Sequence, residues 1–505
     1  MAHRFTPSRT ALGEETATGT SVSINPPAPP KPGFLGTYTK PLLFLVAILV
    51  AVLVAALPIT GLSHDGKITL AAFSFVVVLW IGEVLPAGIS AVLFCTSLVV
   101  ILGNKMPVSV AFGGFATSTT WLLIGAFLLG QATVGTGVAN RIAYLIMRLG
   151  RGSHRRVLIY LWISQIVLAL LTPSTTVRAA MYIPITMGIV QAYRAQNDSR
   201  FAANLLAHVF WGMHMGSLLW YTGTIMNPQI MGILRAETGY GPSYFVYVAW
   251  NIIPCAILTV AVFTIIEWVM PAEKEISETG NLDILDQKLA EMGRMSADEW
   301  KALAFFLVAI ALWATEKIHH IETAWVAVGL GGLLFLPKAG VLKKEVLNRI
   351  NWDIVLLMAV ALGIINIMKQ VTLDTWVTDR VLAPILNPLA SRGASGLAFG
   401  ITIATALVHL IAASAVGETA LMGPLVIRYA HLMGYNPTLA ALVVVKAEMN
   451  VFIFPYQMTP LLVLWGTGYM DMKKCLRIFG ATCAFSIVWI VAMAPLWEWL
   501  IRTIK

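Results

Sequence analysis

Long apolar runs constrain the fold of this 505-residue chain more than any other feature of its sequence. Runs of roughly 20 apolar residues have the length that crosses the ~30 Å hydrocarbon core of a bilayer. Hydrophobic residues make up 58% of the chain and charged residues only 12%, which excludes a soluble domain. The sequence predicts an all-α polytopic membrane protein with roughly eleven transmembrane helices, placed in the cell inner membrane or plasma membrane.

The formal charge of +9 does not indicate a nucleic-acid partner, because the basic residues lie in short connections between apolar runs. The segment 141–156 carries Arg141, Arg148, Arg151, Arg155 and Arg156, and the positive-inside rule explains such a cluster. The cysteines are scattered without a Cys-x-x-Cys pair, so neither a metal site nor a disulfide framework is predicted.

Composition divides the chain into a tail and two membrane halves. Residues 1–39 are rich in Pro, Ser and Thr, which predicts a disordered tail, and their basic charges favour a cytoplasmic amino terminus. A polar connection at 272–300 separates a first membrane half, 40–271, from a second, 301–505. Leu285, Leu289 and Met292 recur there at helical spacing, which predicts an amphipathic surface helix. Ser296 and Glu299 have the spacing of a capping box that starts the next membrane helix.

Two short polar signatures break the apolar runs, Pro-Ser-Thr-Thr-Val-Arg at 173–178 and Ala-Ser-Ala-Val-Gly-Glu at 413–418. Aligning Ser174 with Ser414 places Arg178 opposite Glu418, so the signatures look like copies. A bilayer offers no water to polar groups, and such breaks survive only where protein buries them or where they line a cavity. They predict two re-entrant helical hairpins, near 160–185 and 394–425, related by an inverted repeat.

A further polar break follows each signature, at 221–224 in the first half and at 455–460 in the second. Interrupted apolar segments at matching positions of two halves are typical of a secondary transporter, with the substrate site between them. The order of the features repeats, although the spacings differ between the halves. We therefore expect the four breaks to meet at one site.

The residues at the first signature suit an anion. A helix that starts inside a membrane directs unsatisfied N–H groups and a positive dipole end toward the cavity. Ser174, Thr175 and Thr176 add hydroxyl groups, and Arg178 adds a charge that matches carboxylate geometry. Glu418 is open to three interpretations, because an acid in this position carries a proton, meets a cation or pairs with a base.

Several motifs together carry a family resemblance. They are Trp-Leu-Leu-Ile-Gly-Ala-Phe from Trp121, Pro-Ser-Thr-Thr-Val-Arg from Pro173, Ile-Asn-Trp-Asp from Ile350, the tip at Ser414, and Pro-Tyr-Gln-Met-Thr-Pro from Pro455. In this combination the chain resembles the divalent anion/sodium symporter family of dicarboxylate and citrate carriers. The resemblance implies scaffold and transport domains in each protomer, a homodimer, and an elevator movement that carries a substrate between the two hairpin tips.

The chain departs from that family at both tips. Thr175 stands where the family has Asn, and the second tip continues from Ser414 with Ala and Val, which lack the family's amide and hydroxyl groups. Two sodium sites of the usual kind are therefore not expected. Ser174, Thr175 and Gly223 remain a candidate sodium site, and no other cofactor is predicted.

The same departures resemble the citrate/succinate and 2-oxoglutarate/malate exchanger branch. Arg178 after the first tip and Thr-Gly-Thr-Ile-Met-Asn at 222–227 are similar to that branch, which often has His where this chain has Glu418. The leading hypothesis is anion exchange of small di- or tricarboxylates, with a sodium- or proton-coupled symporter as the alternative. The predicted substrate-binding residues are Ser174, Thr175, Thr176, Arg178, Thr222, Thr224, Asn227, Ser414, Glu418, Thr419, Gln457 and Thr459.

Other function classes find little support in the sequence. There is no His-Glu-x-x-His, Gly-x-Ser-x-Gly or phosphate-binding Gly-x-x-x-x-Gly-Lys-Ser/Thr motif, so the chain is not predicted to be an enzyme or an ATP-driven pump. An anion channel stays open as a less favoured alternative, because two buried tips converging on one site suit alternating access better.

Overall fold

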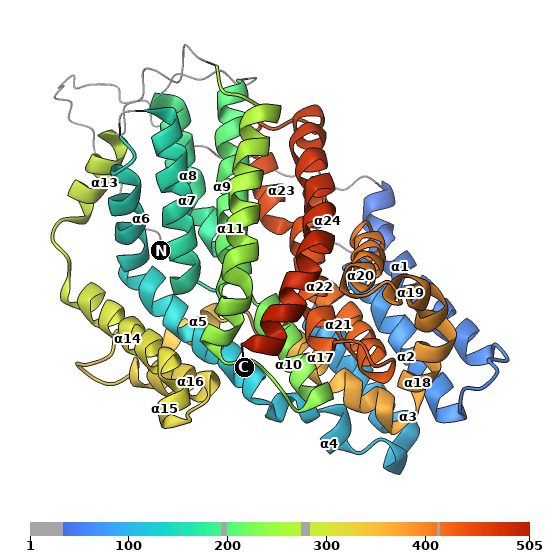
Figure 1. Ribbon diagram of the computed structural model, residues 1–505. Coiled ribbons are helices and arrows are strands. Elements are labelled where there is room, and N and C mark those ends of the chain that lie inside the picture. Colours follow the sequence, from blue (N-terminus) through green and yellow to red (C-terminus); the bar gives the residue numbers. More distant parts are fainter. Residues whose placement is uncertain (1–33, 152, 193–198, 274–282, 412–414, 505) are drawn as a thin grey trace, which may run out of the picture.

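The computed structural model describes residues 34–151, 153–192, 199–273, 283–411 and 415–504. These residues form helices joined by turns, and no strand occurs among them, which confirms the predicted all-α class. Figure 1 shows the helices as one bundle, with α11 (Tyr244–Val269) and α24 (Met472–Thr503) side by side near its middle. Each of these two helices ends a half of the chain.

The other helices fall into the two halves in chain order. Those of the first half are α1 (Phe34–Ala56), α2 (His64–Ile81), α3 (Ala87–Leu102), α4 (Val108–Ala111), α5 (Ser118–Thr136), α6 (Val138–Arg148), α7 (His154–Leu171), α8 (Thr175–Ala192), α9 (Arg200–Leu219) and α10 (Met226–Thr238). Those that follow α11 are α13 (Asp283–Met292), α14 (Ala297–Ala314), α15 (Glu316–His319), α16 (Thr323–Leu333), α17 (Trp352–Gln370), α18 (Leu373–Val377), α19 (Ala383–Ala390), α20 (Ala394–His409), α21 (Ala415–Leu432), α22 (Pro437–Asn450) and α23 (Thr459–Trp465).

In the described part of the chain, 8 helices are long and apolar enough to cross a membrane. These 8 include α7 of the first hairpin, whereas the sequence-based count of roughly eleven keeps the hairpins apart and includes α9, α14 and α16. α9 has 20 residues but carries buried Asn204, His208 and His214, and α14 begins with charged residues. α16 is a shorter apolar helix. The polar side chains of α9 are tolerated because protein surrounds them.

Two pairs of helices occupy the segments in which the hairpins are expected. α7 and α8 lie at the first and α20 and α21 at the second. α8 and α21 each begin one residue after the aligned serines, each has 18 residues, and each contains a proline at its tenth position, Pro184 and Pro424. The second tip itself, including Ser414, lies outside the described residues.

The halves interlock through matching contacts. α3 of the first half packs on α17 of the second, and α16 of the second half packs on α5 of the first. Glycines allow both close approaches, since a Cβ on Gly88 would lie 2.2 Å from the Asp353 carbonyl oxygen and one on Gly125 would lie 2.6 Å from the backbone of Ala327. The opening helix of each repeat, α5 or α17, is therefore held by the other half.

Three sequence-based expectations need correction or completion here. Helix α1 begins at Phe34, inside the predicted tail, of which residues 1–33 lie outside the described part. The helix that carries the Trp121 motif ends at Gly137, which takes a left-handed φ of 90° between α5 and α6. In the polar connection, α13 buries Leu285 and packs on α6 and α8.

Arg141 has a different role from the one that the positive-inside rule suggests. Its side chain is buried, its Nε lies 2.7 Å from Glu299 Oε1, and its Nη1 donates to the Gly293 carbonyl at 2.9 Å. Glu299 also completes the predicted capping box with Ser296 at the start of α14. One carboxylate therefore caps α14 and fixes α6 beside it.

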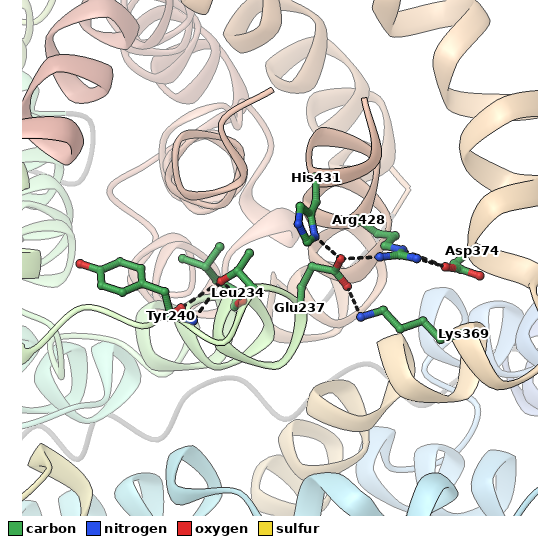
Figure 2. Close-up of polar contacts among 8 residues, drawn as sticks. Leu234, Glu237, Tyr240, Lys369, Asp374, Arg428 and His431 are labelled. Carbon is green, nitrogen blue, oxygen red and sulfur yellow. Dashed lines mark hydrogen bonds and ion pairs between the residues drawn. The ribbon is translucent and has the colours of Figure 1, made fainter. Parts of the chain in front are cut away.

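A second buried acid, Glu237, joins helices of the two halves. The Glu237 carboxylate, at the end of α10, is fully buried and meets Lys369 at 2.8 Å, Arg428 at 2.6 Å and the imidazole of His431 (Figure 2). Arg428 also contacts Asp374 of α18 at 2.5 Å. We call Glu237, Lys369, Asp374, Arg428 and His431 the Glu237 network. It ties α10 to α17, α18 and α21.

Candidate functional site

A cavity of about 210 Å³ lies where the helix breaks meet. It has room for several water molecules, each of which occupies about 30 Å³ in the liquid, and hence for a small organic anion. A larger hollow of about 460 Å³ lies near Gly393 and Arg502, away from both hairpin tips. The lining of the 210 Å³ cavity comprises Glu83, Ala87, Pro173, Ser174, Thr175, Thr176, Thr224, Ile225, Met226, Asp353, Ile354, Leu357, Ala415, Val416, Gln457, Met458, Thr459 and Pro460.

Several helices begin at this cavity. α8 starts at Thr175, α10 at Met226 and α21 at Ala415, and each of these residues lines the cavity. The first N–H groups of a helix have no partner within it, and they form its positive dipole end. Only part of this capacity is used at α8, where Ser174 Oγ accepts the Val177 N–H at 3.3 Å. The cavity is therefore lined by helix N-termini and hydroxyl groups, together with the carboxylates of Glu83 and Asp353.

The structure brings many of the predicted site residues to the cavity. Ser174, Thr175, Thr176, Thr224, Gln457 and Thr459 line it. The Gln457 side-chain amide forms hydrogen bonds within the protein. Its Oε1 accepts the N–H groups of Ile453 and Phe454, and its Nε2 donates to the His409 carbonyl at 3.0 Å. Gln457 thus stabilises the backbone of the break at 455–460.

Arg178 does not line the cavity, contrary to prediction. Its side chain is fully buried, and its guanidinium donates to the carbonyl of Thr172, to the Gly223 carbonyl at 3.1 Å, to the Met213 carbonyl at 3.3 Å and to Ser217 Oγ. These acceptors belong to the first tip, to α9 and to the break that follows it. Arg178 therefore satisfies carbonyl groups that the breaks free from helical hydrogen bonding.

Asn227 and Thr222, two further predicted site residues, also form hydrogen bonds at the break after α9. Asn227 Nδ2 donates to the carbonyls of Ser217 at 2.7 Å and Trp220 at 2.9 Å, and Thr222 Oγ1 lies 3.1 Å from the Tyr244 hydroxyl. The Gly223 carbonyl, predicted as a sodium ligand, accepts from Arg178 instead. Of the candidate sodium site, Ser174 and Thr175 remain at the cavity.

Glu418 and Thr419 lie behind the second tip rather than in the lining. The Glu418 carboxylate contacts the imidazole of His409 on α20, and both side chains are buried. Thr419 Oγ1 lies 2.5 Å from Glu448 Oε2 of α22. Neither predicted residue faces the cavity, because α21 turns both toward neighbouring helices.

Two acids in the lining were not among the predicted site residues. Asp353, in the first turn of α17, accepts the Gly88 N–H at 2.8 Å, and Glu83 has a left-handed φ of 46° just before α3. The signal for Asp353 was present, since it ends the motif from Ile350 that carries the family resemblance. Its role here is to fix α3 beside the start of α17.

The sequence matches a known family and several curated proteins. A family model described as the sodium:sulfate symporter transmembrane region matches residues 37–503. A Cupriavidus necator membrane protein is 27% identical over 90% of this chain and 91% of its own length. The chloroplastic dicarboxylate transporter 2.1 of Arabidopsis thaliana is 27% identical over 82% of this chain and 74% of its own. The L-tartrate/succinate antiporter of Escherichia coli is 22% identical over 90% of this chain and 97% of its own.

Proposed function

The chain belongs to the sodium:sulfate symporter transmembrane family, and from that premise we propose that it exchanges small organic dianions across the membrane. It is a multi-pass membrane transporter and not an enzyme, in line with the sequence-based prediction. The observation that carries the proposal is the start of α8, α10 and α21 at one cavity lined by hydroxyl groups. Helix N-termini of this kind bind carboxylates without needing a bound metal.

Dicarboxylates are the proposed substrates. The names of two relatives refer to dicarboxylate and to L-tartrate with succinate. A dianion has two carboxylates to place, and the cavity offers the start of α8 with Thr175 and Thr176 on one side and the start of α21 with Thr459 on another. Exchange is favoured over sodium symport because the Gly223 carbonyl is engaged by Arg178. A sodium-coupled symporter is the second candidate, supported by the hydroxyl groups of Ser174 and Thr175 at the cavity.

We expect the movement to be an elevator in a homodimer. The packing of α10 on both α17 and α21 supports a common movement of these cavity-lining helices. Cross-linking of single-cysteine variants on opposite faces of that body would test the movement, and the mass of the detergent-solubilised protein would test the dimer.

Uptake of labelled succinate, malate or 2-oxoglutarate into proteoliposomes tests the transport proposal. Each anion is supplied with and without unlabelled anion inside, and with and without an inward sodium gradient. Exchange requires that internal anion stimulates uptake in the absence of sodium. Uptake driven by the sodium gradient alone, with no effect of internal anion, would replace exchange by symport.

Thr176→Val is expected to raise the KM for the anion by about tenfold or more. The change keeps the shape of the side chain but removes a hydroxyl group, and hydrogen bonds to charged groups contribute about 1.5–3 kcal/mol. Thr264→Val is the matched control, because Thr264 Oγ1 on α11 donates to the Val260 carbonyl away from the cavity. Equal KM values for both variants and the parent would remove Thr176 from the site.

A further inference from the structure

A group of buried titratable side chains lies behind the second tip. Glu418 of α21 and Glu448 of α22 are 1% and 0% exposed, and His409 of α20 is fully buried. Among the described residues, one carboxylate oxygen of each acid, Glu418 Oε1 and Glu448 Oε1, has no hydrogen-bond partner, and neither does His409 Nε2. Two buried carboxylates without full partners are costly inside a membrane.

The hydrogen bonds around Thr419 indicate where a proton is held. Thr419 Oγ1 lies 2.5 Å from Glu448 Oε2 and 3.0 Å from the Ala415 carbonyl oxygen. A hydroxyl group has one hydrogen, so it cannot donate to both oxygens. If Glu448 is protonated, its O–H donates to Thr419, and Thr419 donates to Ala415, so that both contacts become hydrogen bonds.

The contact between Glu418 and His409 needs no added proton. The neutral imidazole with its hydrogen on Nδ1 donates to Glu418 Oε2. One added proton, on Glu448, therefore satisfies the remaining contact of the group. Without the proton on Glu448, its charge would face that of Glu418, with which it interacts electrostatically.

Other charged groups of the described packing elements do not neutralise these acids. Lys446 of α22 directs its ammonium group to the Leu218 carbonyl at 2.9 Å and to the Tyr247 hydroxyl. The charges on α10 and α17, which pack on α21, are also engaged elsewhere. Glu237 and Lys369 pair in the Glu237 network, and Arg235 pairs with Glu322. Asp353 lies at the cavity and accepts the Gly88 N–H. α24, which packs on α22, contributes the buried thiols of Cys475 and Cys483.

We propose that Glu448, with Glu418 and His409, forms a proton-binding site that couples the carrier to protons through Thr419 and the start of α21. The coupling rests on the proposed transport function. The link is short, because Thr419, which contacts Glu448, lies one helical turn along α21 from Ala415, which lines the cavity. Loss of the proton from Glu448 adds a buried negative charge behind the start of α21, and this charge opposes the binding of an anion in the cavity. Protonation therefore favours anion binding, and exchange slows as pH rises.

Infrared difference spectroscopy of the detergent-solubilised protein tests the proton site without transport. The C=O band of a protonated carboxylic acid should be present in the parent protein at neutral pH and lost in Glu448→Gln. Glu498→Gln is the control, since Glu498 lies on α24 with its carboxylate beside Arg502. A spectrum without a difference band between the parent and Glu448→Gln would overturn the inference, whatever the transport result.

Exchange in proteoliposomes across a range of pH tests the coupling. We expect the parent and Glu498→Gln to share one pH profile, and Glu448→Gln, which mimics the protonated acid, to lose the dependence and exchange at the low-pH rate. Glu448→Asp should keep a shifted dependence. The same profile for Glu448→Gln and the parent would overturn the coupling while leaving exchange in place. Absence of exchange by the parent at every pH would overturn the proposed function, and the infrared band would then decide the proton site alone.

Discussion

Arg178→Met is expected to abolish transport and to lower the free energy of unfolding by about 3 kcal/mol or more, since hydrogen bonds to charged groups each contribute about 1.5–3 kcal/mol. The guanidinium donates hydrogen bonds to the carbonyls of Thr172, Gly223 and Met213 and to the Ser217 hydroxyl. Removing it leaves the buried Thr172 and Gly223 carbonyl oxygens without this donor, whereas the Met213 carbonyl keeps the Ser217 hydroxyl as a donor. The tips would lose the geometry that forms the cavity.

Arg178→Lys should be intermediate, because an ammonium group has three donors on one atom and cannot reach acceptors spread over two breaks. The measurement is thermal unfolding in detergent together with uptake into proteoliposomes. Arg502→Met is the control, because the Arg502 side chain is exposed on α24 and, within the described part of the chain, forms an ion pair with Glu498 alone. A fully stable Arg178→Met with a raised KM alone would mean that the guanidinium contacts the anion, as the sequence had suggested.

Glu237→Gln is expected to cost about 3 kcal/mol of stability, at the lower end of the range for breaking a buried ion pair. The Glu237 carboxylate is fully buried. The Lys369 and His431 side chains are partly exposed, so water can solvate them when Glu237 loses its charge. Without the charge of Glu237, Arg428 and Lys369 face each other with only Asp374 to offset them (Figure 2). The contact between α10 and α21, on which the cavity depends, would weaken.

A double-mutant cycle with Arg428→Met separates this network from a general packing effect. The double variant should lose less stability than the sum of the single variants, because each removes a partner of the other. Chemical unfolding followed by fluorescence provides the values, with Glu498→Gln as the reference for a surface acid. Strict additivity would show that Glu237 and Arg428 do not stabilise each other.

Local sequence features predicted the hairpins and part of the site. The break positions follow from residues adjacent in sequence, so aligning Ser174 with Ser414 was enough to place α8 and α21. Thr175 and Thr176 reach the cavity because they open a helix, where side chains and free N–H groups share one end. Arg178 is about one helical turn, or ~5 Å, further along α8, and there the packing of α8 on α9 sets the direction of the side chain.

By itself, the sequence determined that the chain is embedded in a membrane, that it is built from two related halves, and where its helices break. Those properties depend on apolar run length and on short motifs, which act over a few residues. Tertiary structure alone decided how the buried charges pair. Arg141 meets Glu299 from 158 residues away, and Glu237 meets Arg428 from 191 residues away. Local spacing cannot specify such partners. A charged group inside a membrane needs an opposite charge, and the packing of the helices decides which one lies near it.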